Sequence, residues 1–443
     1  MACRYFPHTG DDVKRMLDIC RASSLADLYA DVPEELLLKR SYDLPESMSE
    51  PEVRAWFDAV FAKCTPLTCF AGAGAYDHYT PAAIGAVTSR SEFLTAYTPY
   101  QPEISQGTLQ YIFEYQSMMA ALTGLDVSNA SMYDGATATA EAMIMAVNAA
   151  RKKRRVLVSA TLNPAVSQVV GTYARYQNIA VETIPAHDGV TDRDALKQML
   201  GAGDVAGVIA QSPNYNGIIE DFTGWSDDIH ACKALFIINS PALPLAVLKS
   251  PGEWGADIAV GDAQTLGMPL SYGGPYLGYM TARQALIRKL PGRIVGATTD
   301  DRGQRVFVLT LQAREQHIRR EKATSNICSN QGLMTLHAAM YMALMGDKGM
   351  RDVNSLSASA AHELARRLEA TGKMRLTYPG KPFLNEFRIT LADGLDTTHV
   401  LEALCDAGIL GGVAIDDRDM IIACTETRTP ADIDRYVSTI KNL

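Results

Sequence analysis

The feature that most constrains this chain is a series of short, continuous apolar segments between residues 155 and 280, separated by stretches with helical spacing. The segments are rich in Val, Ile, Leu and Ala, as strands covered on both faces must be. Strands that alternate with helices predict a mostly parallel, doubly wound α/β sheet. The predicted strands are 155–160, 179–184, 205–211, 235–239, 257–260 and 276–280, with helices at 163–176 and 192–201 between them.

The sequence on either side of this series follows other patterns. Helical spacing is found at 11–31 and 107–122, and Ser49 is a predicted N-cap ahead of two acids and a proline. After residue 325 we expect helices at 330–345, 356–371, 398–407 and 430–441, and strands at 375–378, 386–391 and 420–423. The expected parts are an N-terminal helical segment at 1–60, a large α/β domain at 61–325 and a small α+β domain at 326–443.

Charge and composition exclude several classes of protein. The net charge of -9 argues against a nucleic-acid partner, because phosphates are bound by clustered Lys and Arg. No apolar run approaches the roughly 20 residues of a membrane span, and no hydrophobic signal segment is visible at the N-terminus. The eight cysteines form no C-x-x-C pair and no zinc-like group with histidine, so we expect reduced thiols, no metal and a cytoplasmic location.

Six stretches carry a family resemblance. They read RYFPHT (4–9), AGAGAYDHYTPAAI (71–84), AYTPYQPEISQGTLQ (96–110), NASMYDGATATAEA (129–142), SPNYNGIIED (212–221) and REQHIRREKATSNICSNQ (314–331). Together, and in this order, they resemble the α-subunit family of two-chain glycine decarboxylases, the P-proteins of the glycine cleavage system. The resemblance implies the fold of pyridoxal-phosphate (PLP) dependent transferases, the aspartate-aminotransferase-like fold type I.

In that fold a lysine holds PLP as an imine, an aspartate pairs with the pyridine nitrogen, and an aromatic or histidine side chain stacks on the ring. The resemblance places Gln264 at the lysine position, Asn239 at the aspartate position and Asn163 at the stacking position. An amide is not a nucleophile, and asparagine carries no charge. We therefore expect no catalytic residue and no covalently bound PLP in this chain.

Other residues are candidates for a substrate pocket or a subunit interface, and each has a plainer interpretation. Gly135 and Tyr133 precede a small-residue helix whose free N–H groups could hold a phosphate, or which is simply buried after a tight turn. The 97–106 loop suits either an active-site wall or an interface, and the basic segment at 314–322 is either a solvated face or a patch facing an anion or partner. The full set is Tyr76, Asp77, His78, Tyr79, Tyr97, Tyr100, Gln101, Gln106, Tyr133, Gly135, Arg314 and His317.

The resemblance also implies partners. A second (β) subunit would carry PLP, and this chain would complete its active site. The complex would bind glycine, release CO2 and transfer the aminomethyl group to the lipoyl arm of the H-protein. Two alternatives stay open at this point: an independent PLP enzyme that uses another lysine, and a non-catalytic regulatory or scaffold protein on the same fold.

Overall fold

The computed structural model describes residues 5, 7–94, 98–150, 152–314, 316–323, 325, 327 and 330–443, without the side chains of 314 and 322. The chain forms two compact units, Met1–Thr65 and Pro66–Leu443. The second unit contains both of the larger expected domains, and the boundaries at 60 and 325 stay predictions.

The first unit contains short helices, and none of its described residues is buried. Its α-helices are α1 (Gly10–Cys20) and α2 (Glu50–Phe61), with 3-10 turns at Leu25–Tyr29 and Glu34–Leu36. A single helix over 11–31 was wrong, because Arg21 adopts a left-handed conformation (φ 57°) and Ser24 starts a new capped turn. The predicted N-cap at Ser49 is confirmed: its backbone N–H and its hydroxyl donate to Glu52 at 2.7 Å each.

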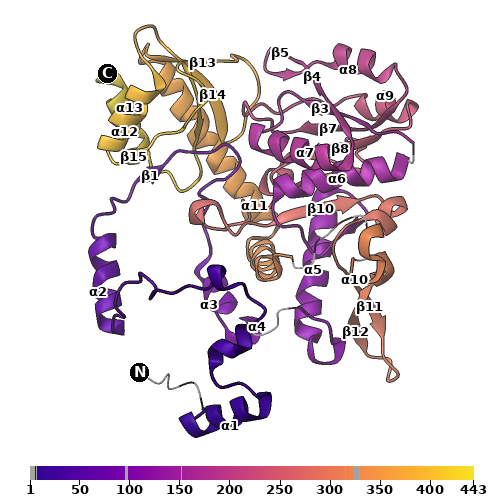
Figure 1. Ribbon diagram of the computed structural model, residues 1–443. Helices are drawn as coiled ribbons and strands as arrows, with labels where there is room; N and C mark the ends of the chain where they lie inside the picture. The colour runs from indigo at the N-terminus through magenta and orange to yellow at the C-terminus, as the bar shows by residue number, and fades with distance from the viewer. Residues whose placement is uncertain are drawn as a thin grey trace. The chain divides into compact units, whose positions relative to one another are not determined.

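The second unit is built on a seven-stranded sheet in the order β2-β10-β9-β8-β7-β3-β4 (Figure 1). Strands β4, β3, β7, β8 and β9 pair in parallel, which confirms the predicted sheet, while β10 runs antiparallel to β9 and β2. The strands are β2 (Val127–Ser128), β3 (Arg155–Ser159), β4 (Ala180–Ile184), β7 (Val205–Gln211), β8 (Leu235–Asn239), β9 (Ile258–Asp262) and β10 (Gly278–Ala282).

Helices cover both faces of this sheet. One core cluster joins the sheet to α6 (Gly135–Ala150) and α7 (Pro164–Gln177), and another joins it to α8 (Arg193–Leu200) and α9 (Trp225–Ala231). Strand β8 shows the alternation, since Ile237 faces the first cluster while Phe236 and Ile238 face the second. The predicted helix at 107–122 is confirmed as α5 (Gln106–Thr123).

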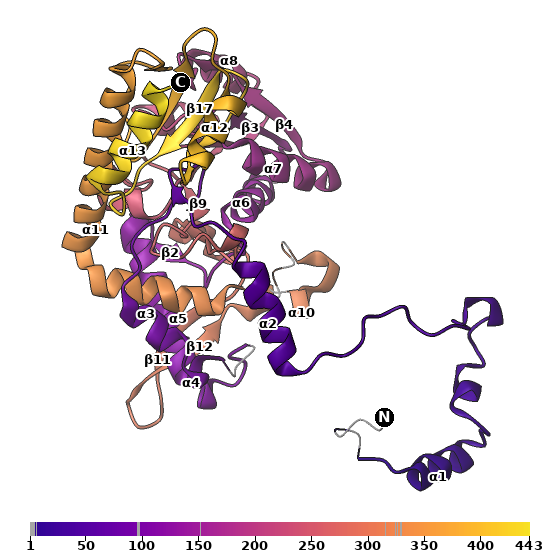
Figure 2. The same ribbon diagram turned by 90° about the vertical axis from the view of Figure 1, so that its left-hand side faces the viewer.

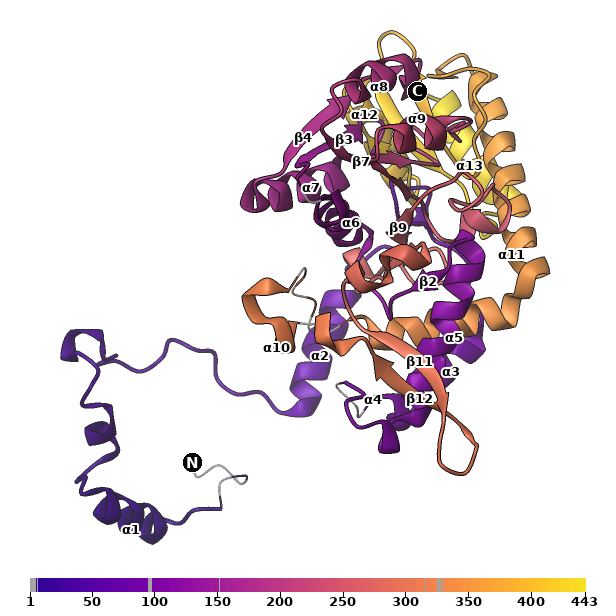
Figure 3. The ribbon, with the colours of Figure 1, turned by 90° about the vertical axis from the view of Figure 1, so that its right-hand side faces the viewer.

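A hairpin that the sequence analysis did not predict follows the sheet. Strands β11 (Ile294–Thr299) and β12 (Arg305–Thr310) are antiparallel, and they project away from the sheet beside α5 (Figure 3). Buried Gln116 of α5 fixes the hairpin, because its side chain accepts from the Val295 N–H at 3.0 Å and donates to the Val295 carbonyl at 2.9 Å.

The C-terminal part has its own apolar cluster around a four-stranded sheet in the order β13-β14-β17-β16. Its elements are β13 (Met374–Leu376), β14 (Glu386–Leu391), α12 (Thr397–Asp406), β16 (Val413–Ala414), β17 (Asp419–Ala423) and α13 (Pro430–Lys441). The helices predicted at 330–345 and 356–371 lie in α11 (Gly332–Glu369), which bends at Gly346 where the backbone is not helical (φ 60°; Figure 2). The break after residue 345 is therefore confirmed, but the second helix begins before 356. The stretch between the two predicted helices is itself helical. Two ion pairs between residues four apart, Lys348 with Asp352 and Arg351 with Asp347, support the helix there.

Short elements complete the second unit. They are β1 (Thr68–Cys69) paired with β15 (Ile409–Leu410), β5 (Ala186–His187) paired with β6 (Val190–Thr191), α3 (Ala82–Thr88), α4 (Ser91–Leu94), α10 (Gln316–Arg319), and 3-10 turns at Pro102–Ile104, Leu243–Ala246, Ser271–Gly273, Gln284–Lys289, Gln312–Arg314 and Arg320–Lys322.

Candidate functional site

A cavity of about 300 Å³ lies where β7, β8 and β9 end at their carboxyl sides. Its walls come from the loop at 72–76, the first turns of α6 and α7, and the ends of these strands. Open α/β sheets bind ligands at this edge, so the cavity is the candidate site. Its polar and aromatic side chains are Tyr76, Asp134, Asn163, Gln211, Tyr215, Asn239, Asp262, Tyr276 and Glu386.

Gln264, at the expected lysine position, is fully buried and engaged with the main chain. Its Oε1 accepts from the Tyr76 N–H at 2.9 Å, and its Nε2 donates to the carbonyls of Tyr76 at 2.8 Å and Met268 at 2.7 Å. The amide therefore ties the 72–76 loop to the turn that follows β9, and it offers no nucleophile.

The two asparagines at the other expected cofactor positions do line the cavity. Asn239 ends β8, and its Nδ2 donates to the Thr139 hydroxyl at 2.7 Å. Asn163 is the N-cap of α7: its Oδ1 accepts from the Ala165 N–H and its Nδ2 donates to the Ala73 carbonyl, both at 2.9 Å. Both amides thus organise the wall through neutral hydrogen bonds.

The first turn of α6, the expected phosphate position, already faces a carboxylate of the chain itself. The Gly135 N–H donates to Oδ2 of Asp262 at 3.1 Å, and Oδ1 of Asp262 accepts from the Gln264 N–H at 2.8 Å. A Cβ at Gly135 would lie 2.7 Å from the Asp262 nitrogen, so glycine is required for this close approach. The N–H dipoles that favour an anion are therefore met by Asp262.

The titratable side chains of the cavity wall are acidic. Burial raises the pKa of Asp262 to about 6, although N–H groups of Gln264 and Gly135 oppose the shift. Burial also raises the pKa of Glu386 to about 7, against hydrogen bonds from the Ala73 N–H (2.5 Å) and the Tyr76 hydroxyl (3.0 Å). No Lys, Arg or His lies among the described residues that line the cavity.

These residues do not fit PLP. The phosphate is an anion that needs N–H donors or cations, and the imine needs a primary amine. Here Asp262 and Glu386 contribute acidic side chains, no lysine lies among the described lining residues, and Gln264, at the expected lysine position, carries no amine. Lys249, the lysine nearest to this region in the sequence, lies with its Nζ 3.7 Å from the centre of the Trp254 ring.

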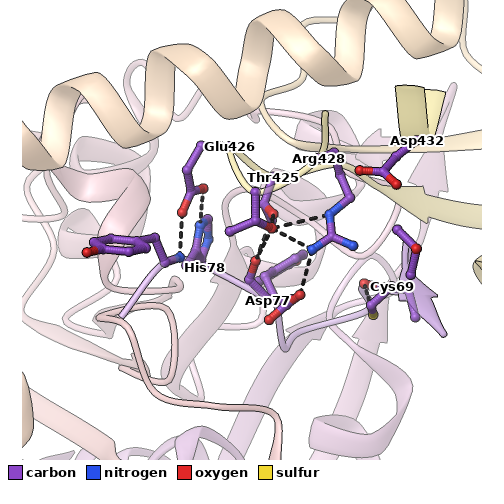
Figure 4. A network of polar contacts seen from close by, with 12 residues as sticks. Cys69, Asp77, His78, Thr425, Glu426, Arg428 and Asp432 are labelled. Carbon is purple, nitrogen blue, oxygen red and sulfur yellow. Dashed lines mark hydrogen bonds and ion pairs between the residues drawn. The ribbon is translucent and has the colours of Figure 1, made fainter. Parts of the chain in front are cut away.

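The residues that follow Tyr76 are held by the C-terminal part (Figure 4). Arg428 pairs with Asp77 at 2.7 Å, and buried His78 pairs through Nδ1 with Glu426 at 2.8 Å. Glu426 also accepts from the Tyr79 N–H at 2.6 Å. Although burial opposes it, the hydrogen bond from His78 helps to hold the pKa of Glu426 below its usual range. Asp77 and His78 therefore join two parts of the unit, and the Tyr79 ring is exposed.

Residues 98–106 lie apart from the cavity, beside the hairpin. Tyr100 is exposed, its ring lies 5.5 Å from the Arg293 guanidinium, and its hydroxyl accepts from Arg293 at 3.4 Å. Gln106 accepts from the Phe307 N–H and donates to the Phe307 carbonyl, both at 2.9 Å. Gln101 is exposed, and Tyr97 lies outside the described residues.

Tyr133 and the basic segment meet at a second hollow of about 540 Å³. Glu141 of α6 also lines it, and burial raises the pKa of this glutamate to about 7, against a hydrogen bond from Ser325. Arg320 contributes to the same wall, and His317 is exposed on α10. Arg314 lies at the end of the Gln312–Arg314 turn, and its side chain is outside the description.

The structure thus brings only part of the predicted set together. Tyr76 and Gly135 line the cavity with Asn163 and Asn239, whereas the other candidates that the structure describes do not line it. The sequence analysis did not single out the remaining polar wall residues, Asp134, Gln211, Tyr215, Asp262, Tyr276 and Glu386. Their positions at strand ends could have indicated Gln211 and Asp262, and Tyr215 lies within a stretch quoted for the resemblance. Glu386 begins a strand of the C-terminal part and has no local signal.

Two negative findings hold within the described part of the chain. No helix there is long and apolar enough to cross a membrane. Within the same residues, no group of three or more His, Cys, Asp or Glu side chains is placed to hold a metal ion.

Comparison with known proteins identifies similar sequences and a matching family model. A model described as "Glycine cleavage system P-protein" matches residues 3–440. A protein of Moorella thermoacetica is 46% identical over 445 residues, covering 99% of each chain, and one of Geobacillus sp. is 46% identical over 447 residues, covering 99% and 98%. Both are named "Probable glycine dehydrogenase (decarboxylating) subunit 1".

Solved structures agree. A crystal structure of glycine decarboxylase (P-protein) of the glycine cleavage system, in inhibitor-bound form, is 40% identical with a TM-score of 0.90 and covers 99% of this chain and 100% of its own. A sphingosine-1-phosphate lyase of Burkholderia pseudomallei has a TM-score of 0.67 at 14% identity, covering 91% and 92%. The second likeness shows only that the fold, the PLP-dependent transferase fold type I, is shared.

Proposed function

The chain belongs to the glycine cleavage system P-protein family, and we propose on this premise that it is the α subunit of a two-chain glycine dehydrogenase (decarboxylating). The assembled enzyme binds glycine, releases its carboxylate as CO2 and passes the aminomethyl group to the lipoyl arm of the H-protein. PLP supplies the electron sink for this chemistry and is held by the partner (β) chain.

The observation that carries the proposal is the state of Gln264. Its amide is fully buried and makes three hydrogen bonds to the main chain, at the position where the family resemblance predicts the lysine. Asp262 and Glu386 add negative charge where the cofactor phosphate and its partners would need positive charge. A chain with this wall supports catalysis only by completing a site whose cofactor lies elsewhere.

Surfaces outside the cavity are the candidates for that contribution. Exposed Tyr100, held by Arg293, and the basic turns at 314–322 offer side chains that suit directed and charged contacts with a partner. We propose that one lies near the cofactor pocket of the β chain and the other near an anionic group. The expected cytoplasmic location stays a prediction from the spacing of the cysteines.

A non-catalytic regulatory protein on the same fold is the alternative, and the names of the curated relatives favour the enzyme subunit. Mixing experiments distinguish the enzyme subunit from the regulatory protein. Each chain, alone and combined with the other, is incubated with lipoyl H-protein, glycine and labelled bicarbonate, and exchange of label into glycine is measured.

We expect exchange only when both chains are present. Borohydride reduction followed by peptide mapping should place the pyridoxyl group on the β chain alone. Full exchange by the β chain without this chain, or a reduced adduct on any lysine of this chain, would contradict the proposal.

The surface assignment has its own test. Tyr100→Ala should weaken assembly or glycine turnover, at a cost of roughly 1–3 kcal/mol if the ring is an interface anchor. Arg314→Ala should have a similar effect. The matched controls are Tyr176→Ala, which removes a tyrosine that is 78% exposed on α7, and Arg302→Ala, in the loop between β11 and β12. Equal assembly and equal glycine turnover in all four variants would show that both segments are ordinary solvated surface.

A further inference from the structure

The cavity at the end of the central sheet holds buried acids without a counter-ion. Glu386 is buried, Asp262 is partly buried, and Asp134 lines the same space. Among the described residues, no ion pair involves any of these three acids. Buried charges in proteins are normally paired with an opposite charge, so this group lacks the component that would neutralise it.

Hydrogen bonds satisfy these carboxylates only in part. Each oxygen of Glu386 accepts one bond, from the Ala73 N–H and the Tyr76 hydroxyl. Asp262 accepts from the N–H groups of Gln264 and Gly135, and a backbone hydrogen bond from Leu277 also lowers its pKa. Because a carboxylate oxygen accepts two bonds, both groups keep capacity for a further donor, and a cationic donor would also balance the charge.

The remaining wall suits the same kind of ligand. Three tyrosines, Tyr76, Tyr215 and Tyr276, line the cavity, and electron-rich ring faces attract ammonium groups. An anion finds little here, because the Gly135 N–H is already engaged by Asp262. The side-chain amide of Asn163 likewise donates to the protein itself.

Size is compatible with a small ligand. A cavity of about 300 Å³ lies at the lower end of the range for small-molecule pockets. A zwitterion such as glycine would also bring its own carboxylate next to Glu386 and Asp262. The charge pattern therefore favours a cation without a carboxylate.

We infer that this cavity binds a small primary alkylammonium ion, of which methylammonium is the simplest, with Glu386 and Asp262 as its counter-charges. The site lies in this chain alone, so the inference does not depend on the proposed partnership with a PLP-bearing chain. It would give the subunit a ligand site of its own, separate from the cofactor chemistry.

The test uses the full chain without the β subunit, so that no PLP is present to react with amines. Binding of methylammonium is followed by calorimetry at about pH 8, where both acids are largely ionised. We expect saturable binding of one equivalent with a millimolar dissociation constant, and at least tenfold weaker binding of glycine, acetate, inorganic phosphate and K⁺.

Variants locate the site. Glu386→Gln should weaken methylammonium binding at least tenfold, Asp262→Asn should do the same, and Glu402→Gln, an exposed change on α12, should leave it unchanged. Lowering the pH to about 5.5 should weaken binding to a similar degree, because the two acids, with raised pKa values of about 7 and 6, take up protons.

Three results would overturn the inference. One is the absence of saturable binding at concentrations up to about 50 mM. Another is unchanged affinity in both cavity variants, each checked for a native melting transition. The third is preferential binding of phosphate or acetate, or of K⁺ as tightly as methylammonium, which would make the cavity an anion site or a general cation site.

Discussion

Replacing Glu386 by glutamine should make the protein less sensitive to alkaline pH. The side chain is only 6% exposed, and in the folded chain it accepts hydrogen bonds from the Ala73 N–H and the Tyr76 hydroxyl. Glutamine has the same shape and keeps one accepting oxygen. The substitution therefore removes the ionisation of the buried group while disturbing the packing little.

The magnitude follows from the pKa of Glu386. Burial raises it from 4.5 to about 7, so the folded state holds the proton more tightly than the unfolded state. This stabilisation is present at low pH and is lost as the pH rises from about 4.5 through about 7. The full difference corresponds to roughly 3 kcal/mol, of which about 2–3 kcal/mol is lost between pH 5 and pH 8.

The assay is urea unfolding followed by tryptophan fluorescence, since Trp225 is almost fully buried. At about pH 5 the variant and the wild type should have nearly the same unfolding free energy. At about pH 8 the variant should be more stable by about 2–3 kcal/mol. Glu402→Gln, an exposed change, serves as the control and should follow the wild type at both pH values.

Parallel pH profiles for the wild type and Glu386→Gln would refute this reasoning, because they would mean that the carboxyl does not change its ionisation on folding. A variant that is less stable than the wild type by the same amount at both pH values would refute it as well. That result would show that the hydrogen bonds of the carboxyl outweigh its burial.

Three further predictions concern neighbouring parts of the molecule. Gly135→Ala should lower the free energy of unfolding by roughly 1–3 kcal/mol, measured by urea titration, because the added Cβ would lie 2.7 Å from the Asp262 nitrogen; an unchanged midpoint would contradict the close approach. His78→Ala should cost roughly 1–3 kcal/mol in the same titration, because buried Glu426 would lose one hydrogen bond while keeping those from the Tyr79 N–H and the Ser357 hydroxyl; an unchanged midpoint would contradict this contact. Gln264→Lys should show no absorbance near 420 nm with added PLP and no glycine decarboxylation without the β chain, since the acidic wall remains; either signal would show that a missing amine alone prevents cofactor binding.

The sequence by itself determined the central sheet. Short apolar runs such as 155–159 and 235–239 alternate with helical stretches, and this pattern favours strands covered on both sides. The family resemblance, rather than the strand pattern, singled out Asn239 and Gln264, and their assignment to cofactor positions stays a prediction. Local capping chemistry also sufficed to place Ser49 at the start of α2.

The tertiary structure alone decided what those positions do. That the Gln264 amide turns to the main chain of Tyr76, 188 residues away, depends on how the 72–76 loop packs. Glu386 reaches the cavity from the C-terminal sheet because Gly72 leaves room for its carboxylate, and a Cβ there would collide with it. The hairpin beside α5 and the continuity of α11 through 347–355 are decided in the same way, by contacts between distant segments. Hydrophobic periodicity shows which face of one helix or strand is apolar, but not which distant side chain packs against it. The charge of this cavity depends on such contacts between distant segments.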